Sequence, residues 1–411
     1  MEAAAHGRDW LPAAEAAARL GVKPQTLYAY VSRGLIRSER VPGSRRSRFA
    51  RDDVERLAQR ARRTTAPGRL DVVIDTELTL LDPGGALAYR GWDVVDAAHH
   101  ATYEEVAEWL WTGVRAPQPP AWAASKDAVR IGRAVQRSLP AGASVPDRVR
   151  VVVPALAVAD PLRYDRRRDA VVDTARTLLS SLVDALPLTE GASTPSGRSV
   201  AARLWPRLAS LRATPARVRT LDTALVLLAD HELAASALAA RVAASTWADP
   251  YLVVSAGLAA AGGPLHGGAS ARARVLLASV ADGTPAEVAI GDLLRRDEPV
   301  PGFGHRVYRA RDPRAVVLLD AVSSMRPPRA VLRASDDILA VMARHGGAHV
   351  NVDFALAVFA EAASMVDDAG EAIFELSRCA GLVAHGMEEY EHRLRYRPRA
   401  AYVGPPVTRR G

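Results

Sequence analysis

The chain has 411 residues, of which 49% are hydrophobic and 5% aromatic, and its formal net charge is +8. Its single cysteine, Cys379, excludes an internal disulfide and a cysteine-based zinc cluster, and no apolar run is long enough to span a bilayer. This composition favours a largely helical, soluble protein, which we expect in the reducing cytoplasm because the N-terminus also lacks an apolar signal core.

The basic charge is concentrated near the N-terminus. Residues 1–63 contain 14 of the 54 Lys and Arg but only 7 of the 46 Asp and Glu, so +7 of the net +8 lies there. A separate basic block of this kind indicates a polyanionic partner for that block alone.

Residues 8–64 are predicted to form a small winged helix-turn-helix module. A short helix should end at Gly21, and a second helix should follow after a tight turn. A wing should have Gly43 at its tip, and a third helix should begin with Asp52 or Asp53 as its N-cap.

This segment resembles the MerR and excisionase type of winged helix-turn-helix, which implies double-stranded DNA as a partner. The alternative is a solvated basic helical hairpin that contacts protein. The resemblance points to a set of side chains for the major groove and the phosphates: Gln25, Thr26, Tyr28 and Arg33 on the second helix, and Arg45, Arg46 and Arg48 on the wing.

Residues 62–71, "RRTTAPGRLD", have the composition of a linker, which predicts a second domain over residues 68–411. This domain should open with two short strands around the turn "DPGG". Thr102 and Glu105 form a capping-box pattern for a helix that Gly113 should end. Long helices rich in Ala, Leu and Val then continue to about residue 280.

Three short stretches differ from this helical background: "GGPLHGGAS" at 262–270, "VPGFGHRVYRARDPRA" at 300–315 and "HVNVDF" at 349–354. Each holds a histidine or an aspartate beside small or constrained residues, where a ligand can approach closely. Two histidines and a carboxylate suit proton abstraction next to a carbonyl. Nearby arginines would hold carboxylates or phosphates bidentately.

Together with "IDTELTLLDPGGALAYRGWDV", "ALVLLADHELAASALAARVAASTWADPY" and "RPRAAYVGP", these stretches resemble citrate synthases over residues 70–404. The resemblance implies an almost all-α homodimer with a large and a small helical domain, the small one covering about residues 270–370. It also implies the condensation of acetyl-CoA with oxaloacetate, with acetyl-CoA as a substrate and neither a cofactor nor a metal ion.

The resemblance assigns roles residue by residue. Asp353 would take the α-proton of the thioester, His266 would hydrogen-bond the thioester oxygen, and His305 would act on the oxaloacetate carbonyl. Oxaloacetate would be held by His231, Arg314 and Arg397. Arg309 would lie near the CoA phosphates, with Gly302 and Gly304 along the CoA.

The chain also departs from the family pattern. Ser270 stands where an Asn is usual, Ala234 and Ala237 replace an Asn and a Thr, and "FALA" at 354–357 replaces a more polar run. Two other functions therefore stay open. One is a 2-methylcitrate synthase that uses propionyl-CoA, and the other is a DNA-binding transcription regulator that senses a ligand through a synthase-like domain.

Overall fold

The computed structural model divides the chain into two compact units, residues 1–75 and 76–411. It describes residues 10–20, 22, 24–32, 35–41, 47–62, 73–82, 84–116, 120–195, 197–263, 268–305, 307–308, 311–346 and 348–397. Among these residues, no helix is both long and apolar enough to cross a membrane.

Unit 1 combines helices with a three-stranded antiparallel sheet of order β1-β3-β2. Its elements are β1 (Trp10–Pro12), α1 (Ala13–Leu20), α2 (Pro24–Ser32), β2 (Ser38–Arg40), β3 (Ser47–Ala50) and α3 (Arg51–Arg62). Leu11, Leu27 and Phe49 are fully buried and belong to one hydrophobic cluster. This small core holds α1 and α2 against the sheet.

The predicted wing is confirmed, because β2 and β3 pair antiparallel with Ser38 opposite Phe49. The glycines predicted at its tip and after the first helix lie outside the described residues. The predicted N-cap of the third helix is wrong. That helix begins at Arg51, so Asp52 and Asp53 lie inside its first turn, and Asp53 accepts hydrogen bonds from the backbone N (2.9 Å) and Nε (2.8 Å) of Arg37.

Unit 2 is almost entirely helical, with a small antiparallel sheet of order β4-β5-β6 near its start. The strands are β4 (Thr79–Leu81), β5 (Leu87–Tyr89) and β6 (Trp92–Asp93). The helices up to the middle of the unit are α4 (Val94–His100), α5 (Tyr103–Thr112), α6 (Lys126–Ser138), α7 (Val145–Leu156), the 3-10 turn η1 (Ala157–Ala159), α8 (Arg168–Ala185), α9 (Val200–Leu208), α10 (Pro215–Leu228), α11 (Ala235–Ser245) and α12 (Pro250–Ala261). The remaining helices are α13 (Ala269–Ala281), α14 (Ala286–Arg295), α15 (Pro313–Ser323), α16 (Arg329–Arg344), α17 (Val352–Ala362) and α18 (Ala369–His392).

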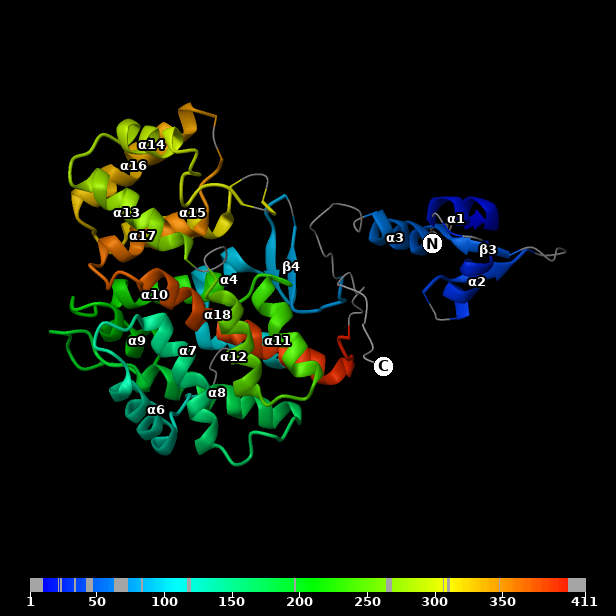
Figure 1. Cartoon of the computed structure of the whole chain (residues 1–411), viewed down its shortest axis with the longest axis horizontal. Coiled ribbons are helices and arrows are strands. Elements are labelled where there is room, and N and C mark those ends of the chain that lie inside the picture. The colour runs from blue at the N-terminus through cyan, green and yellow to red at the C-terminus, as the bar shows by residue number, and fades with distance from the viewer. Residues whose placement is uncertain are drawn as a thin grey trace, which may run out of the picture. The chain divides into compact units, whose positions relative to one another are not determined.

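The helices of unit 2 form two groups (Figure 1). In the smaller group, α13 packs against α16 and α17, and α15 packs against α17. In the larger group, α18 lies at the centre and packs against α5, α7, α8, α10, α11 and α12. Nearly every residue of α18 is buried. Because α18 also carries residues of the site described below, this helix connects the core of the unit to that site.

The local predictions for the start of unit 2 are confirmed. Thr102 and Glu105 form a reciprocal capping box on α5, and Gly113 ends the helix with a left-handed φ of 70°. The two strands around the "DPGG" turn pair as β4 and β5, and β6 adds a strand that the sequence reasoning did not predict.

Candidate active site

Two of the three predicted stretches pair with each other through their backbones. Phe303 and Val350 form an antiparallel bridge, and the backbone N of Gly304 donates to the oxygen of His349 at 2.7 Å. Gly302 and Gly304 both have left-handed φ values, of 84° and 82°. A Cβ on Gly302 would lie 2.6 Å from the Cβ of Phe354, so only glycine allows this close approach.

Asn351 joins these two stretches through its side chain. Its Oδ1 accepts from the backbone N of Asp353 at 3.0 Å and so caps α17. Its Nδ2 donates to the oxygen of Gly304 at 2.8 Å. One carboxamide therefore fixes the backbone next to His305 and the backbone of Asp353 at the same time.

The tautomer of His305 follows from its hydrogen bonds. Its Nδ1 accepts from the backbone N–H groups of Val307 (3.0 Å) and Tyr308 (3.2 Å), so the proton of the neutral ring belongs on Nε2. Burial, helped by the positive charge of Arg314 and opposed by Asp312, lowers the pKa of His305 to about 4. At neutral pH the ring is an uncharged hydrogen-bond donor, which suits it to polarise a carbonyl.

His231 and Tyr308 lie beside His305. The ring centroids of His231 and His305 are 5.3 Å apart, and those of His305 and Tyr308 are 4.5 Å apart. The Nε2 of His231 lies 3.2 Å from the hydroxyl of Tyr308, and burial raises the pKa of that phenol to about 12. Tyr308, which the sequence reasoning missed, is thus a neutral group in contact with two of the predicted site histidines.

Arg314 is buried and held in place by Asp312. Its Nε and Nη2 donate to the two carboxylate oxygens at 3.0 and 2.8 Å. Asp312 also caps α15 and accepts from the backbone N of Val352 at 3.1 Å, which ties α15 to α17. The Nη1 group of Arg314 has no hydrogen-bond partner among the described residues, so it is available to an anionic ligand.

Asp353 lies in the first turn of α17, and its carboxyl group is protonated more easily than usual. Burial raises the pKa of Asp353 to about 6, with Asp312 acting in the same direction and Arg314 and Arg272 against it. A carboxylate with a pKa near the working pH is both ionised and basic enough to abstract a proton.

A second buried guanidinium, Arg378 of α18, belongs to this region and was not predicted. Its Nε donates to the oxygen of Leu228 at 3.0 Å, and its buried Nη1 has no partner within the described part of the chain. Burial, together with the charge of Arg314, lowers the pKa of Arg378, whereas Asp230 and Tyr89 raise it. Its signal in the sequence was a basic residue directly before the apolar run "CAGLVA".

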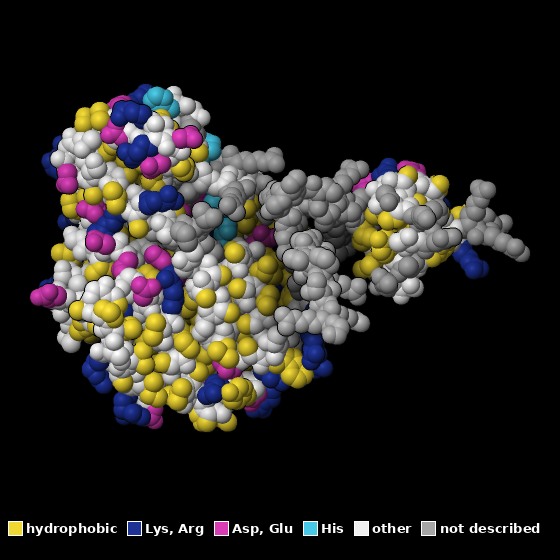
Figure 2. All heavy atoms as spheres, in the orientation of Figure 1, with side chains coloured by type: hydrophobic (Ala, Val, Ile, Leu, Met, Phe, Trp, Pro, Cys, Tyr) yellow, Lys and Arg dark blue, Asp and Glu magenta, His cyan; other side chains and the backbone are white. Residues whose placement is uncertain are grey.

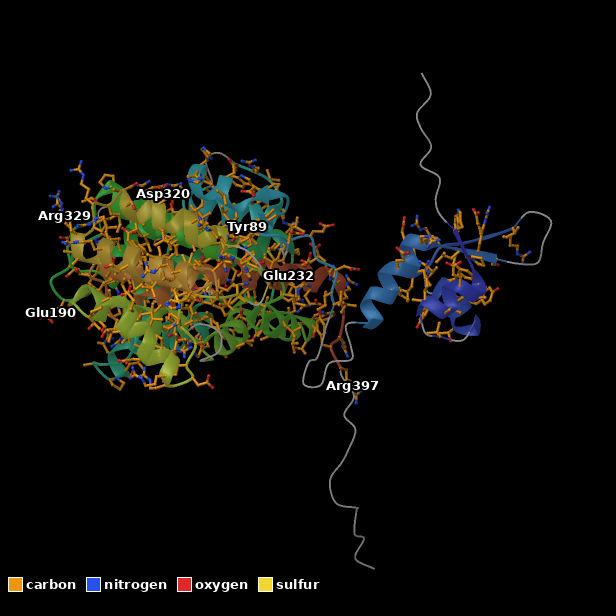
Figure 3. The ribbon with its side chains drawn as sticks, turned by 90° about the horizontal axis from the view of Figure 1, so that it is seen from above. Tyr89, Glu190, Glu232, Asp320, Arg329 and Arg397 are labelled. Atoms are coloured by element: carbon orange, nitrogen blue, oxygen red, sulfur yellow. The ribbon has the colours of Figure 1, made fainter. Side chains whose placement is uncertain are left out.

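The structure therefore brings together Gly302, Gly304, His305, His231, Arg314 and Asp353. Arg397 does not join them within one chain. It is exposed beyond α18 and lies at the edge of the larger unit, away from Tyr89 and Glu232 (Figure 3). His266 and Arg309 lie outside the described residues.

A hollow of about 490 Å³ adjoins the site. Arg272 lines it and also acts electrostatically on Asp353, and the segment from Pro299 to Pro301, which leads into Gly302, forms part of its wall. Arg296 also lines the hollow, where it pairs with Glu298 at 2.9 Å, and Asp292 is a second acidic residue of the same lining. In the described part of the chain, no group of three or more His, Cys, Asp or Glu side chains is arranged to hold a metal ion.

In unit 1, the side chains of two predicted DNA-contact residues each contact another residue of the unit. Tyr28 is half exposed on α2. Its ring centroid lies 5.8 Å from that of Phe49, in an edge-to-face arrangement. Arg48 pairs with Glu39 across the wing at 2.6 Å. Thr26 is partly buried on α2, and Gln25 lies on the same helix. Arg33, Arg45 and Arg46 lie outside the described residues.

Comparisons with known proteins show the family of the chain. The family model described as "Citrate synthase, C-terminal domain" matches residues 70–399. The chain belongs to the citrate synthase family. A second model, "Helix-turn-helix domain", matches residues 10–62, so the chain is a citrate synthase-family enzyme that carries a helix-turn-helix domain.

Relatives named citrate synthase and a relative named 2-methylcitrate synthase both match most of the chain. A citrate synthase of Haloferax volcanii is 31% identical over 373 residues, which are 81% of this chain and 94% of that protein. A 2-methylcitrate synthase of Shewanella oneidensis is 28% identical and covers 78% of this chain and 89% of its own length.

A solved citrate synthase family member has been captured with its ligands. The structure of the ternary complex of carboxymethyl coenzyme A and oxaloacetate with citrate synthase from Thermoplasma acidophilum is 25% identical, with a TM-score of 0.66. It covers 82% of this chain and 95% of the solved chain.

Proposed function

We propose that the enzyme condenses acetyl-CoA with oxaloacetate and water to give citrate and CoA, with neither a metal ion nor a further cofactor. The observation that carries the proposal is the cluster of two imidazoles, a buried arginine and a carboxylate with a raised pKa. This set supplies a base, a neutral donor for a carbonyl and a cation for a carboxylate.

In the proposed reaction, the ionised carboxylate of Asp353 removes a proton from the carbon next to the thioester. The resulting enolate attacks the keto carbon of oxaloacetate, and a carbon–carbon bond forms. The Nε2–H of His305 donates to the keto oxygen and supplies the proton as that oxygen becomes an alkoxide and then a hydroxyl. Water then cleaves the thioester, which releases CoA, and His266 would stabilise the enol by hydrogen-bonding the thioester oxygen.

The two carboxylates of oxaloacetate would be bound by groups that lack protein partners. Arg314 offers its Nη1, Arg378 offers its buried Nη1, and both guanidinium groups influence each other electrostatically. His231 would add a hydrogen bond from the same side as His305. Two buried cations in one region are stabilised when a dianion joins them.

The hollow lined by Arg272 and Arg296 is our candidate for the acyl-CoA site. It has a cation for phosphate groups, apolar walls for the pantetheine arm, and a position beside Asp353. Arg309 would reach the CoA phosphates, and the backbone at Gly302 and Gly304 would lie along the CoA.

Propionyl-CoA is the second candidate substrate, because a 2-methylcitrate synthase is among the relatives. The two substrates differ by one methylene, which a binding pocket distinguishes by only about 1–3 kcal/mol. The decisive experiment measures CoA release with oxaloacetate and each acyl-CoA in turn. A higher kcat/KM for acetyl-CoA supports the first proposal, and a higher value for propionyl-CoA replaces it with the second.

We also propose that unit 1 binds double-stranded DNA. The support is the charge of +7 over residues 1–63, the wing of β2 and β3, and the exposed aromatic ring of Tyr28 on α2. Binding should weaken steeply with salt, since phosphate contacts release counterions. Absence of binding to any duplex at low salt would remove this proposal, whereas DNA binding without turnover on any acyl-CoA would favour a regulator.

Finally, we propose a homodimer formed through α7 and α12. These helices pack on each other. Val151 of α7, Leu252 of α12 and Val158 of the adjoining turn η1 leave large parts of their apolar side chains exposed. Figure 2 shows hydrophobic side chains gathered over the region where Figure 1 draws α7, α11 and α12. A contiguous apolar surface of this kind is typical of an interface between copies.

A further inference from the structure

The turn that presents His231 is held by the residue before it. Asp230 is fully buried, and its Oδ2 accepts from the hydroxyl of Thr79 at 2.5 Å and from the backbone N of Glu232 at 3.1 Å. Glu232 has a left-handed φ of 55°, which costs conformational energy in a non-glycine residue. The Asp230 carboxylate therefore stabilises an unfavourable turn whose central residue is His231.

His385 of α18 faces the other oxygen of this carboxylate. Its Nε2 lies 3.2 Å from the Oδ1 of Asp230, and neither atom forms a hydrogen bond within the described part of the chain. Its Nδ1 accepts from the Nε of Arg241 at 3.0 Å. A guanidinium group can only donate, so Arg241 places the ring proton on Nε2, where it points at Asp230.

The same chain of contacts continues to the C-terminal segment. Arg241 is fully buried, donates from Nη1 to the Oε2 of Glu389 at 3.2 Å, and also binds Glu388. The hydroxyl of Tyr396 donates to the Oε2 of Glu389 at 2.7 Å. The network thus runs from the turn at His231 to the residue that precedes Arg397.

Gly381 makes this arrangement sterically possible. A Cβ at this position of α18 would lie 2.3 Å from the Oδ1 of Asp230 and 2.5 Å from the oxygen of Ala229. The backbone N of Gly381 donates to that same oxygen at 3.0 Å. The glycine therefore lets α18 approach the turn closely enough for His385 to reach Asp230.

We infer that His385 is a positioning residue for the oxaloacetate side of the site, acting through Asp230 on His231, and that Tyr396 anchors the far end of the same network. The inference rests on the proposed function, since it names oxaloacetate as the ligand that His231 contacts. His385 itself does not touch the substrate.

The first test compares two substitutions that each keep one of the two contacts of His385. His385→Gln keeps a donor at the position of Nε2, facing Asp230, whereas His385→Asn keeps only an acceptor for Arg241. Loss of the Nε2–H that faces the Asp230 carboxylate should weaken oxaloacetate binding in His385→Asn by about tenfold or more, and His385→Gln should recover most of that loss. Oxaloacetate affinity is measured by calorimetry without acyl-CoA, and the KM of acyl-CoA should stay within about twofold.

Melting temperatures separate this role from a purely structural one. Each variant loses one of the two buried polar contacts of His385, so similar losses of stability with a large difference in oxaloacetate affinity support the inference. Equal oxaloacetate affinity in the two variants, or parallel changes for both substrates, overturns it. Wild-type protein that binds oxaloacetate without turnover rejects the proposed reaction alone, and wild-type protein that does not bind oxaloacetate rejects both.

The second test uses the far end of the network, where the substitutions are milder. Tyr396→Phe removes the donor to Glu389, and Tyr390→Phe is the matched control because its hydroxyl bonds only the oxygen of Ala248. Tyr396→Phe should weaken oxaloacetate binding by about two- to fivefold, and Tyr390→Phe should leave it unchanged. In the double variant with Tyr396→Phe and His385→Gln, the loss of oxaloacetate affinity should not equal the product of the two single losses, because residues of one network are coupled. Equal effects of the two tyrosine substitutions contradict the coupling.

Discussion

At the scale of single residues, the chemistry depends on two pKa values that burial moves in useful directions. Burial lowers the pKa of His305 to about 4 and raises that of Asp353 to about 6. Between pH 7 and 8 the imidazole is therefore neutral and the carboxylate is ionised, which are the protonation states that a donor and a base require.

The pH dependence of turnover should report Asp353. The base acts only when ionised, so kcat/KM should fall as pH decreases through about 6, whereas His305 should add no transition above pH 5. Initial rates of CoA release from pH 5 to 9 check this. A constant rate down to pH 5 would contradict the assignment of the base.

Asp353→Asn should separate activity from stability. The substitution should lower kcat by about 10²- to 10⁴-fold, because it removes the base. The folded state raises the pKa of Asp353 above its unfolded value, so ionising it destabilises the fold as pH rises through about 6. The variant should thus gain melting temperature over the wild type at pH 8 but not at pH 4, and a loss at pH 8 would contradict this sign.

At the scale of elements, the starts of two helices position the proposed catalytic base and the arginine. Asn351 caps α17 just before Asp353, and Asp312 caps α15 just before Arg314. Each cap also bonds a second segment: Asn351 bonds Gly304, and Asp312 bonds the backbone of Val352. The caps therefore set the relative positions of the base, the arginine and the loop of His305.

Asn351→Ala should reduce both stability and turnover. Loss of the cap should cost about 1 kcal/mol of unfolding free energy, and loss of the bond to Gly304 should free the backbone next to His305. Asn351→Asp is the control, since it keeps the cap acceptor and loses the donor to Gly304. In Asn351→Asp, denaturant unfolding should show stability restored relative to Asn351→Ala, and CoA release should show a kcat that is still reduced. Full activity in Asn351→Asp would reject the role of the donor.

The wing of unit 1 offers a second test at this scale. Glu39 neutralises Arg48, so Glu39→Gln should free that guanidinium and remove a charge that repels phosphate. In Glu39→Gln, duplex binding should tighten, and the slope of log binding constant against log salt concentration should steepen by about one counterion. Arg48→Gln should weaken binding and make that slope shallower. Titrations at several salt concentrations check this, and an unchanged slope in both variants would exclude Arg48 from the interface.

At the scale of the whole molecule, the proposed dimer bears on how the site is completed. Arg397 lies away from the other predicted site residues within one chain, although the resemblance assigns it to oxaloacetate. The exposed apolar side chains of α7 and α12 offer a surface for a second copy. A dimer would also bring two DNA-binding units into one particle, which suits a duplex with repeated half-sites.

Leu252→Glu should break the proposed dimer. Leu252 is 48% exposed on α12, so a charge there should leave the monomer folded but cannot be buried against a second copy without a large penalty. Light scattering after size exclusion should show half the particle mass with helical content preserved. Exposed Val275 on α13 provides a control, since Val275→Glu should not change the mass.

Much of the fold could be read from local sequence signals, because these act within a few residues. Thr102, Glu105 and Gly113 define α5 by side-chain capping and a left-handed turn, and the "DPGG" turn defines the hairpin of β4 and β5. The N-cap of α3 was mispredicted because the helix already begins at Arg51, and the carboxylate of Asp53 accepts hydrogen bonds from Arg37, a distant residue in sequence.

The sequence alone also identified the family and the residues His231, His305, Arg314 and Asp353, since each lies in a recognisable motif. The roles of Tyr308, Arg378, His385 and Gly381 emerged only from the tertiary structure. Their contacts are made with segments far away in the chain, such as α18 with the turn at Asp230. Burial, which shifts the pKa values and leaves the Nη1 atom of Arg378 without a partner among the described residues, exists only once those segments have packed together.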